Sequence, residues 1–291
     1  MGGGAWTKDS FATYASSRGR SVSSTGEVEG KYSTQQMYES RSLAPELNPK
    51  GVIRECRDTE DHPETIPVIL ALDVTGSMGK ATVEIAKKLN VIMTELYGKV
   101  KDVEFLIMGI GDLAYDIAPI QASQFESDIR IAEQLDKLYF EGGGGTNSYE
   151  SYTAAWYFGL HHTDLDCWKR GKKGIIITLG DEPLNPYLPA DKLKAFLGSN
   201  LQSDIETKGL YAAVSEKFDI YHLVVDDKET SYNYNKDKIK ESFGEYLDSG
   251  HLITVNMNNL ATTIVNIITE AAVSSQTETS AVANSGDGIS W

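Results

Sequence analysis

The sequence predicts an α/β fold with a doubly wound, mostly parallel central sheet and helices on both faces. Short, fully apolar runs such as PVILALD (residues 67–73) and GIIITLG (174–180) are typical of buried parallel strands. Segments between such runs carry apolar residues at helical spacing. Because strands and helices alternate along the chain, a parallel sheet covered by helices is the expected architecture.

The first half of the predicted domain follows this alternation. The strand at 67–73 leads into a helix at 78–97, whose apolar residues recur every three or four positions. The next strand is expected at 103–110, and a shorter edge strand at 115–121, because Pro119 is tolerated only at an edge or a bulge. Charged residues alternating with apolar ones predict a surface helix at 125–138, and a further helix is expected at 148–162 with Tyr152, Ala155, Trp156 and Gly159 facing the sheet.

The second half continues the pattern to the last helix. The apolar run at 174–180 predicts a central strand. The remaining expected elements are helices around 190–197 and 204–216, a strand at 218–225, a helix at 236–247, a strand at 251–255 and a helix at 258–272, with a Tyr/Asn-rich loop at 231–235.

Polar segments flank the predicted domain. Residues 1–60 are expected to form an extended or partly disordered arm, because the first fifty are rich in Gly, Ser, Thr, Tyr and Glu and show no sustained period. Residues 61–273 form the predicted domain, and residues 274–291 a flexible tail. The arm still holds aromatic residues such as Trp6 and Phe11, which could dock on the domain's own flank or on a neighbouring subunit.

Charge, the lengths of the apolar runs and the cysteines indicate which kinds of partner and which compartment to expect. The net charge of −15 argues against nonspecific nucleic-acid binding, which needs clustered Lys and Arg. The longest apolar runs are too short to span a bilayer, and no leader pattern opens the chain. The two cysteines, Cys56 and Cys167, have neither metal-site nor disulfide-framework spacing, so they are expected to be reduced thiols in a cytoplasmic protein.

Three loops at the carboxyl ends of predicted strands carry unusual chemistry. They supply a set of oxygen side chains: Asp73, Thr75, Ser77, Thr146 (behind the glycines 142–145) and Asp181. Each loop alone has a simpler interpretation: a helix cap at Ser77, a flexible glycine linker, and a turn at Asp181. Ligands of parallel sheets bind beyond the carboxyl ends of the strands, and oxygens without His or Cys suit Mg²⁺, Mn²⁺ or Ca²⁺. Together these loops predict an open divalent-cation site.

The order Asp73-x-Thr75-x-Ser77, then Thr146, then Asp181 resembles the von Willebrand factor A (VWA) domain and its metal-ion-dependent adhesion site (MIDAS). The resemblance covers about residues 65–273, with Thr75 in place of a serine and Gly-Asp-Glu-Pro after the central strand in place of the commoner Asp-Gly order. It implies that these five side chains hold the metal directly or through water. It also implies that a partner's carboxylate completes the coordination, and that the partner is a protein, with an AAA+ ATPase suggested by intracellular relatives.

The interpretation adopted is a cation-dependent protein-binding module for intracellular assembly, without catalysis. A Mg²⁺-dependent phosphoryl-transfer enzyme of haloacid-dehalogenase type is the alternative, since DVTGS and TLGDEP also resemble its loops and Asp73 would then be a nucleophile. Against it, no phosphate-steadying lysine can be assigned and a long helix starts directly after the loop. A structural assembly subunit is the third class, favoured by the polar ends.

Overall fold

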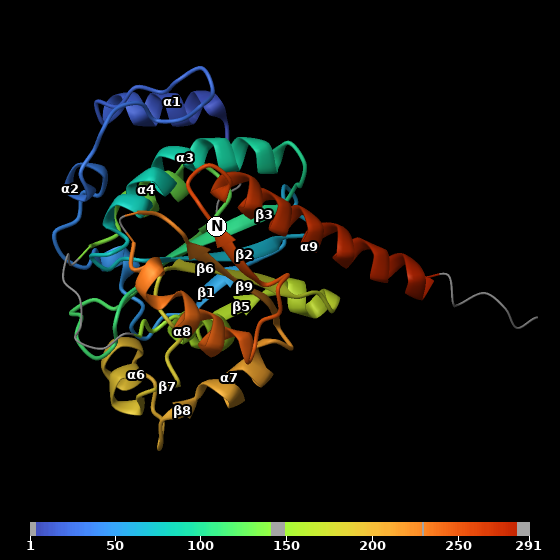
Figure 1. The fold of residues 1–291 in the computed structure, drawn as a ribbon. Helices are drawn as coiled ribbons and strands as arrows, with labels where there is room; N and C mark the ends of the chain where they lie inside the picture. The colour runs from blue at the N-terminus through green and yellow to red at the C-terminus, as the bar shows by residue number, and fades with distance from the viewer. Residues whose placement is uncertain (1–3, 141–148, 229, 284–291) are drawn as a thin grey trace, which may run out of the picture.

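A six-stranded, mostly parallel sheet forms the centre of the molecule (Figure 1). The computed structural model describes residues 4–140, 149–228 and 230–283. The strand order is β10-β9-β6-β2-β3-β4, and within this sheet only the β3–β4 pair is antiparallel. The strands are β2 (Ile66–Asp73), β3 (Val103–Ile110), β4 (Ile120–Glu126), β6 (Gly174–Gly180), β9 (Phe218–Val225) and β10 (Leu252–Val255). The predicted fold class is confirmed.

Helices cover both faces of the sheet, and the sheet divides the apolar core in two (Figure 1). One core lies under α3 (Gly79–Tyr97), α4 (Arg130–Asp136) and α9 (Leu260–Ala283). The other lies under α5 (Thr153–His161), α6 (Ala190–Leu197), α7 (Thr207–Val214) and α8 (Tyr232–Gly244). Strand β2 lies between the two, and seven of its eight residues are buried, as its continuous apolar run predicts.

The antiparallel edge strand begins later than expected. The sequence predicted it at 115–121, whereas β4 spans Ile120–Glu126, with Pro119 just before it. The Pro119 carbonyl accepts a hydrogen bond from the Gly111 amide, so the proline closes the turn and lies outside the ladder that its missing N–H would interrupt.

Two helical boundaries and several short elements also differ from the prediction. Residues 232–235, expected in a loop, form the first turn of α8, and α9 continues to Ala283, past the predicted tail boundary at residue 273. Short pairs that the sequence did not predict are β1 (Arg54–Cys56) with β5 (Thr163–Leu165), and β7 (Tyr187–Leu188) with β8 (Ile205–Glu206).

The N-terminal segment packs on the domain and contains two helices, α1 (Lys8–Ser17) and α2 (Thr34–Met37). Figure 1 shows both beside α3 and α4. Trp6 is buried, and its Nε1 donates a hydrogen bond of 3.0 Å to Asn90 Oδ1 in α3. The buried Arg20 guanidinium binds both carboxylate oxygens of Asp136, at 3.1 and 2.9 Å.

These contacts show where the aromatic residues of the N-terminal arm lie. The arm was expected to be extended or partly disordered, and residues 8–17 are helical. The aromatic side chains of Trp6 and Phe11 lie on the domain's own flank, one of the two positions considered for them. The domain limits at residues 60 and 273 remain predictions. Within the described ranges, no helix is long and apolar enough to cross a membrane.

Candidate metal centre

The loops after β2 and β6 meet at one edge of the sheet. These strands are parallel neighbours, with Leu72 opposite Leu179, so Asp73 and Asp181 leave the sheet side by side. The Val74 amide donates to the Ile110 carbonyl of β3, which fixes the start of the first loop, and α3 begins at Gly79. Helix α3 therefore starts directly after the hydroxyl-bearing residues, as the sequence predicted.

Four of the five predicted ligands form a continuous run of oxygen atoms. Asp73 Oδ1 accepts hydrogen bonds from the Thr75 amide (2.9 Å) and from Thr75 Oγ1 (2.5 Å). Thr75 Oγ1 lies 3.5 Å from Ser77 Oγ, and Ser77 Oγ donates to Asp181 Oδ1 at 3.1 Å. The fifth residue, Thr146, lies outside the described residues.

The spacing of these oxygens fits a small divalent cation. Ligands about 2.1 Å from Mg²⁺ and at right angles to one another are separated by roughly 3.0 Å. The three successive side-chain separations in the run, 2.5, 3.5 and 3.1 Å, bracket that value. Among the described residues no group of three His, Cys, Asp or Glu side chains could hold a metal, so a cation here would depend on the hydroxyls of Thr75 and Ser77.

Ser77 does not cap the helix. The N-cap position of α3 is Met78, without a side-chain hydrogen bond, and the Ser77 hydroxyl is directed at Asp181 instead. The simpler interpretation of Ser77, as a helix cap, is therefore wrong in this structure.

The two aspartates are buried and close to each other. Neither has measurable solvent exposure. Burial, followed by the charge of Asp181, raises the pKa of Asp73 to about 7. Burial also raises the pKa of Asp181, against hydrogen bonds from Ser231 and Ser77. A bound cation would relieve both effects, because it stabilises the ionised form of each carboxylate.

Tyr152 is a site residue that sequence reasoning placed only in the core. Its hydroxyl donates a hydrogen bond of 2.8 Å to Asp73 Oδ2, the oxygen that faces away from Thr75. A Cβ on Gly180 would overlap with this hydroxyl, so the Gly180 position must lack a side chain. A glycine at the end of a buried strand was the only signal in the sequence that another group approaches there.

Further carboxylates surround the site and were not predicted. Glu150 is 6 % exposed, and burial followed by the charge of Asp73 raises its pKa to about 11. Asp112, just after β3, is 3 % exposed. Burial, then the charge of Asp181, raises the pKa of Glu182 to about 7. The position of Asp112 after a third parallel strand was the available signal, since the ends of neighbouring strands meet.

Comparisons with known proteins bear on the fold. No protein-family model and no curated protein sequence matches the chain. The pilus adhesin SpaC from Lactobacillus rhamnosus GG, in its open conformation, is 14% identical, with a TM-score of 0.47 over 77% of this chain and 31% of that one. The vWF domain of the type V pili tip protein Mfa5 from Porphyromonas gingivalis is 12% identical, with a TM-score of 0.44 over 72% of this chain and 96% of that one. The PilB minor pilin from Streptococcus sanguinis is 12% identical, with a TM-score of 0.44 over 72% of this chain and 61% of that one.

These similarities concern the fold alone. The chain spans about a third of the length of the SpaC adhesin, 31%. One of the similar structures is a vWF domain, the family that the motif order resembles. A metal-ion-dependent adhesion site and an AAA+ ATPase partner stay predictions.

The expected cytoplasmic location is contradicted. The similar structures include a pilus adhesin, a pili tip protein and a minor pilin, which point away from the cytoplasm. The sequence argument for that location used two unpaired thiols and the lack of a recognised leader. The described structure shows Cys56 and Cys167 as free and buried, and buried thiols can remain unpaired in any compartment.

Proposed function

We propose that this chain is a divalent-cation-dependent protein-binding module. The observation that carries the proposal is the unbroken run of oxygens from Asp73 through Thr75 and Ser77 to Asp181. Mg²⁺ is the first candidate, with Mn²⁺ and Ca²⁺ as the other hard cations. Thr146 is proposed as a further ligand from its position in the motif order.

The proposed site keeps positions for an incoming ligand. Two carboxylates and two hydroxyls leave part of an octahedral shell to water or to a partner's group. The chain carries a net charge of −15, and an acidic partner would be repelled without the ion. A bound cation reverses the local sign and can accept a partner's carboxylate, so the metal would set both affinity and specificity.

Phosphoryl transfer is the less supported alternative. A nucleophilic Asp73 would need a free carboxylate oxygen facing the substrate. The Asp73 side chain is instead fully buried, with Thr75 bonded to one carboxylate oxygen and the Tyr152 hydroxyl to the other, so neither oxygen faces a substrate. The proposal is therefore a binding function without catalysis.

Titration calorimetry with MgCl₂ and MnCl₂ on the full chain tests the proposal. The wild type should bind one ion per chain, and Ser77→Ala should lose at least about tenfold in affinity, because it removes a ligand oxygen and the bond to Asp181. Ser203→Ala, at an exposed position, is the matched control. No heat of binding for the wild type would refute the metal site. Metal-dependent hydrolysis of p-nitrophenyl phosphate that is lost in Asp73→Asn would support the enzyme instead.

A further inference from the structure

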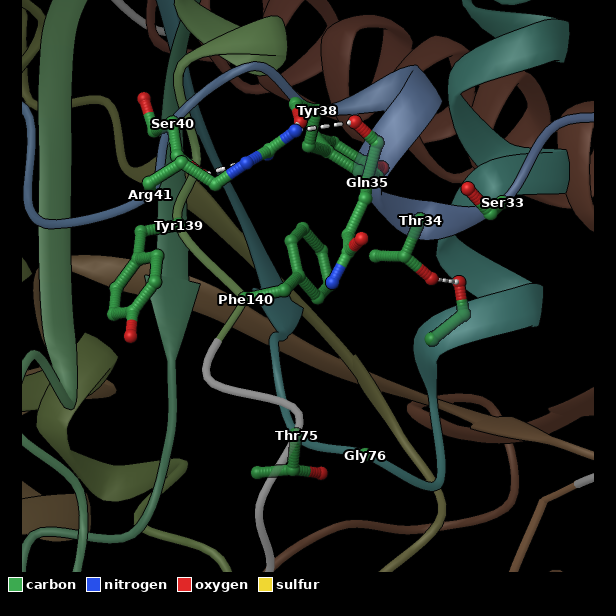
Figure 2. Close-up of a pocket in the computed structure, with 11 residues that line it drawn as sticks. Ser33, Thr34, Gln35, Tyr38, Ser40, Arg41, Thr75, Gly76, Tyr139 and Phe140 are labelled. Atoms are coloured by element: carbon green, nitrogen blue, oxygen red, sulfur yellow. Dashed lines mark hydrogen bonds between the residues drawn. The ribbon is translucent and has the colours of Figure 1, made fainter.

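A pocket of about 520 Å³ adjoins the candidate metal centre. Figure 2 shows that its lining comes from three parts of the chain: the N-terminal segment 33–41, the loop residues Thr75 and Gly76, and the end of the segment after α4, Tyr139 and Phe140. Thr75 is both a proposed metal ligand and part of this lining. A group bound to the cation could therefore extend into the pocket.

Residues 33–41 form a wall that is fixed to the domain. Ser33 and Gln36 cap each other's backbone amides at the start of α2. The Thr34 hydroxyl donates to the Gly79 carbonyl at 3.1 Å, and the Tyr38 hydroxyl donates to the Thr82 carbonyl at 2.7 Å. Both carbonyls belong to the first turn of α3, which begins directly after the metal loop. The wall and the proposed cation site are therefore held to the same rigid element.

Arg41 supplies a positively charged group with spare hydrogen-bonding capacity. Its guanidinium donates to the carbonyls of Gln35 (2.9 Å), Tyr38 (3.0 Å) and Ser40 (3.3 Å). A guanidinium has five N–H donors, so these three bonds orient the group and leave donors for a ligand. Within the described part of the chain, Arg41 forms no ion pair with an Asp or Glu side chain.

The rest of the lining suits the body of an extended peptide. The Phe140 ring packs against Tyr38, with centroids 4.3 Å apart. In Figure 2, Phe140 lies between the Arg41 guanidinium and the Thr75–Gly76 loop. An aromatic surface between two positive groups, the proposed cation and Arg41, can accept the apolar stem of a glutamate side chain.

We propose that this pocket is a specificity subsite for an acidic peptide segment of a partner protein. One carboxylate of the segment binds the metal, and a second carboxylate, on a nearby residue, binds Arg41 across the Phe140 ring. The inference rests on the proposed metal-dependent function and adds the class of its partner. Charge complementarity favours it, since the pocket presents two positive groups on a chain whose net charge is −15.

Fluorescence anisotropy tests the subsite. The probe is a fluorescein-labelled peptide of alternating glycine and glutamate, compared with the same peptide carrying glutamine, added to the full chain in MgCl₂ and in EDTA. The wild type should bind only the glutamate peptide, and only with Mg²⁺. Arg41→Gln should weaken this binding about tenfold or more, as expected for a charge-assisted hydrogen bond, while its Mg²⁺ affinity measured by calorimetry stays unchanged. The peptide affinity of Arg41→Lys should lie between those of the wild type and Arg41→Gln, because lysine keeps the charge but lacks the forked donors of the guanidinium.

Lys208→Gln removes the same charge from α7, on the other face of the sheet, and should change the affinity less than twofold. Equal affinity of the wild type and Arg41→Gln, or equal binding of the glutamine peptide, would overturn the subsite. Mg²⁺ binding without any glutamate-peptide binding would also overturn it, while the metal site would stand. The absence of Mg²⁺ binding would refute the proposed function and the subsite together.

Discussion

Asp73→Asn should stabilise the metal-free protein at pH 8 while abolishing cation binding. The wild-type carboxylate is fully buried, and burial followed by the charge of Asp181 raises its pKa to about 7 from an ordinary value of 3.8. A carboxyl group with a raised pKa in the folded state contributes stability that is fully present below its unfolded pKa. That stability is lost as the pH rises through the folded pKa. Without metal, the wild type should therefore lose stability between about pH 4 and pH 8.

The size of the effect follows from the shift. About three pKa units correspond to an upper limit of roughly 4 kcal/mol at pH 8, at about 1.4 kcal/mol per unit. Asn keeps an oxygen for the Thr75 amide, and its NH₂ group can donate to the Tyr152 hydroxyl, so the hydrogen bonds of Asp73 have substitutes. At roughly 2–4 °C per kcal/mol, the variant should melt several degrees above the wild type in EDTA at pH 8.

The assay is thermal unfolding by circular dichroism in EDTA from pH 5 to pH 8. The difference between the variant and the wild type should shrink towards pH 5, where the wild-type carboxyl group is protonated. Glu216→Gln, at an exposed position, removes the same charge and should leave the trend unchanged. In millimolar MgCl₂ the difference should shrink, because only the wild type gains binding energy. A variant that melts below the wild type in EDTA at every pH would show that Asp73 is structural, and would refute this reasoning.

Three further outcomes follow from packing. Gly180→Ala should lower the melting temperature and the Mg²⁺ affinity together, because its Cβ would overlap with the Tyr152 hydroxyl that holds Asp73. Trp6→Ala should lower the free energy of unfolding, measured in urea, by about 3 kcal/mol, as large-to-small changes at buried aromatic positions do. Trp6→Phe should recover part of this loss. Deleting residues 1–50 should expose the apolar flank of α3 and increase the binding of a hydrophobic dye. A truncated chain with an unchanged melting temperature would instead support the predicted domain boundary at residue 60.

The central strands were predictable because their signal is local. A short, continuous apolar run in an α/β protein is buried on both sides only in a strand between two layers of helices. Strands β2, β6 and β9 accordingly begin and end within a residue of their predicted limits. The edge strand β4 was misplaced because edge strands lack such a run. Its limits depend on pairing with β3, which a single segment does not reveal.

The candidate site was partly predictable for a topological reason. Parallel neighbouring strands deliver their carboxyl ends to one edge, so oxygen side chains following β2 and β6 had to meet there. Tyr152 and Glu150 belong to the segment that leads into α5. Whether their side chains point towards Asp73 depends on how that segment docks on the sheet, and residue spacing does not set this.

The N-terminal segment shows why its composition alone could not decide whether it packs on the domain or on a neighbouring subunit. A polar segment with few apolar residues cannot form its own core, but it can fold on an apolar surface that another element presents. Helix α3 presents such a surface, since its buried side chains include Val83, Ile85, Ala86, Leu89, Ile92 and Met93, more than one sheet-facing stripe requires. A helix that is apolar on several sides needs cover from more than the sheet, and here α9 and the segment carrying Trp6 and Phe11 provide it. The decisive signal for the arm therefore lay in the excess apolar surface of residues 79–97 and not in the arm's own sequence.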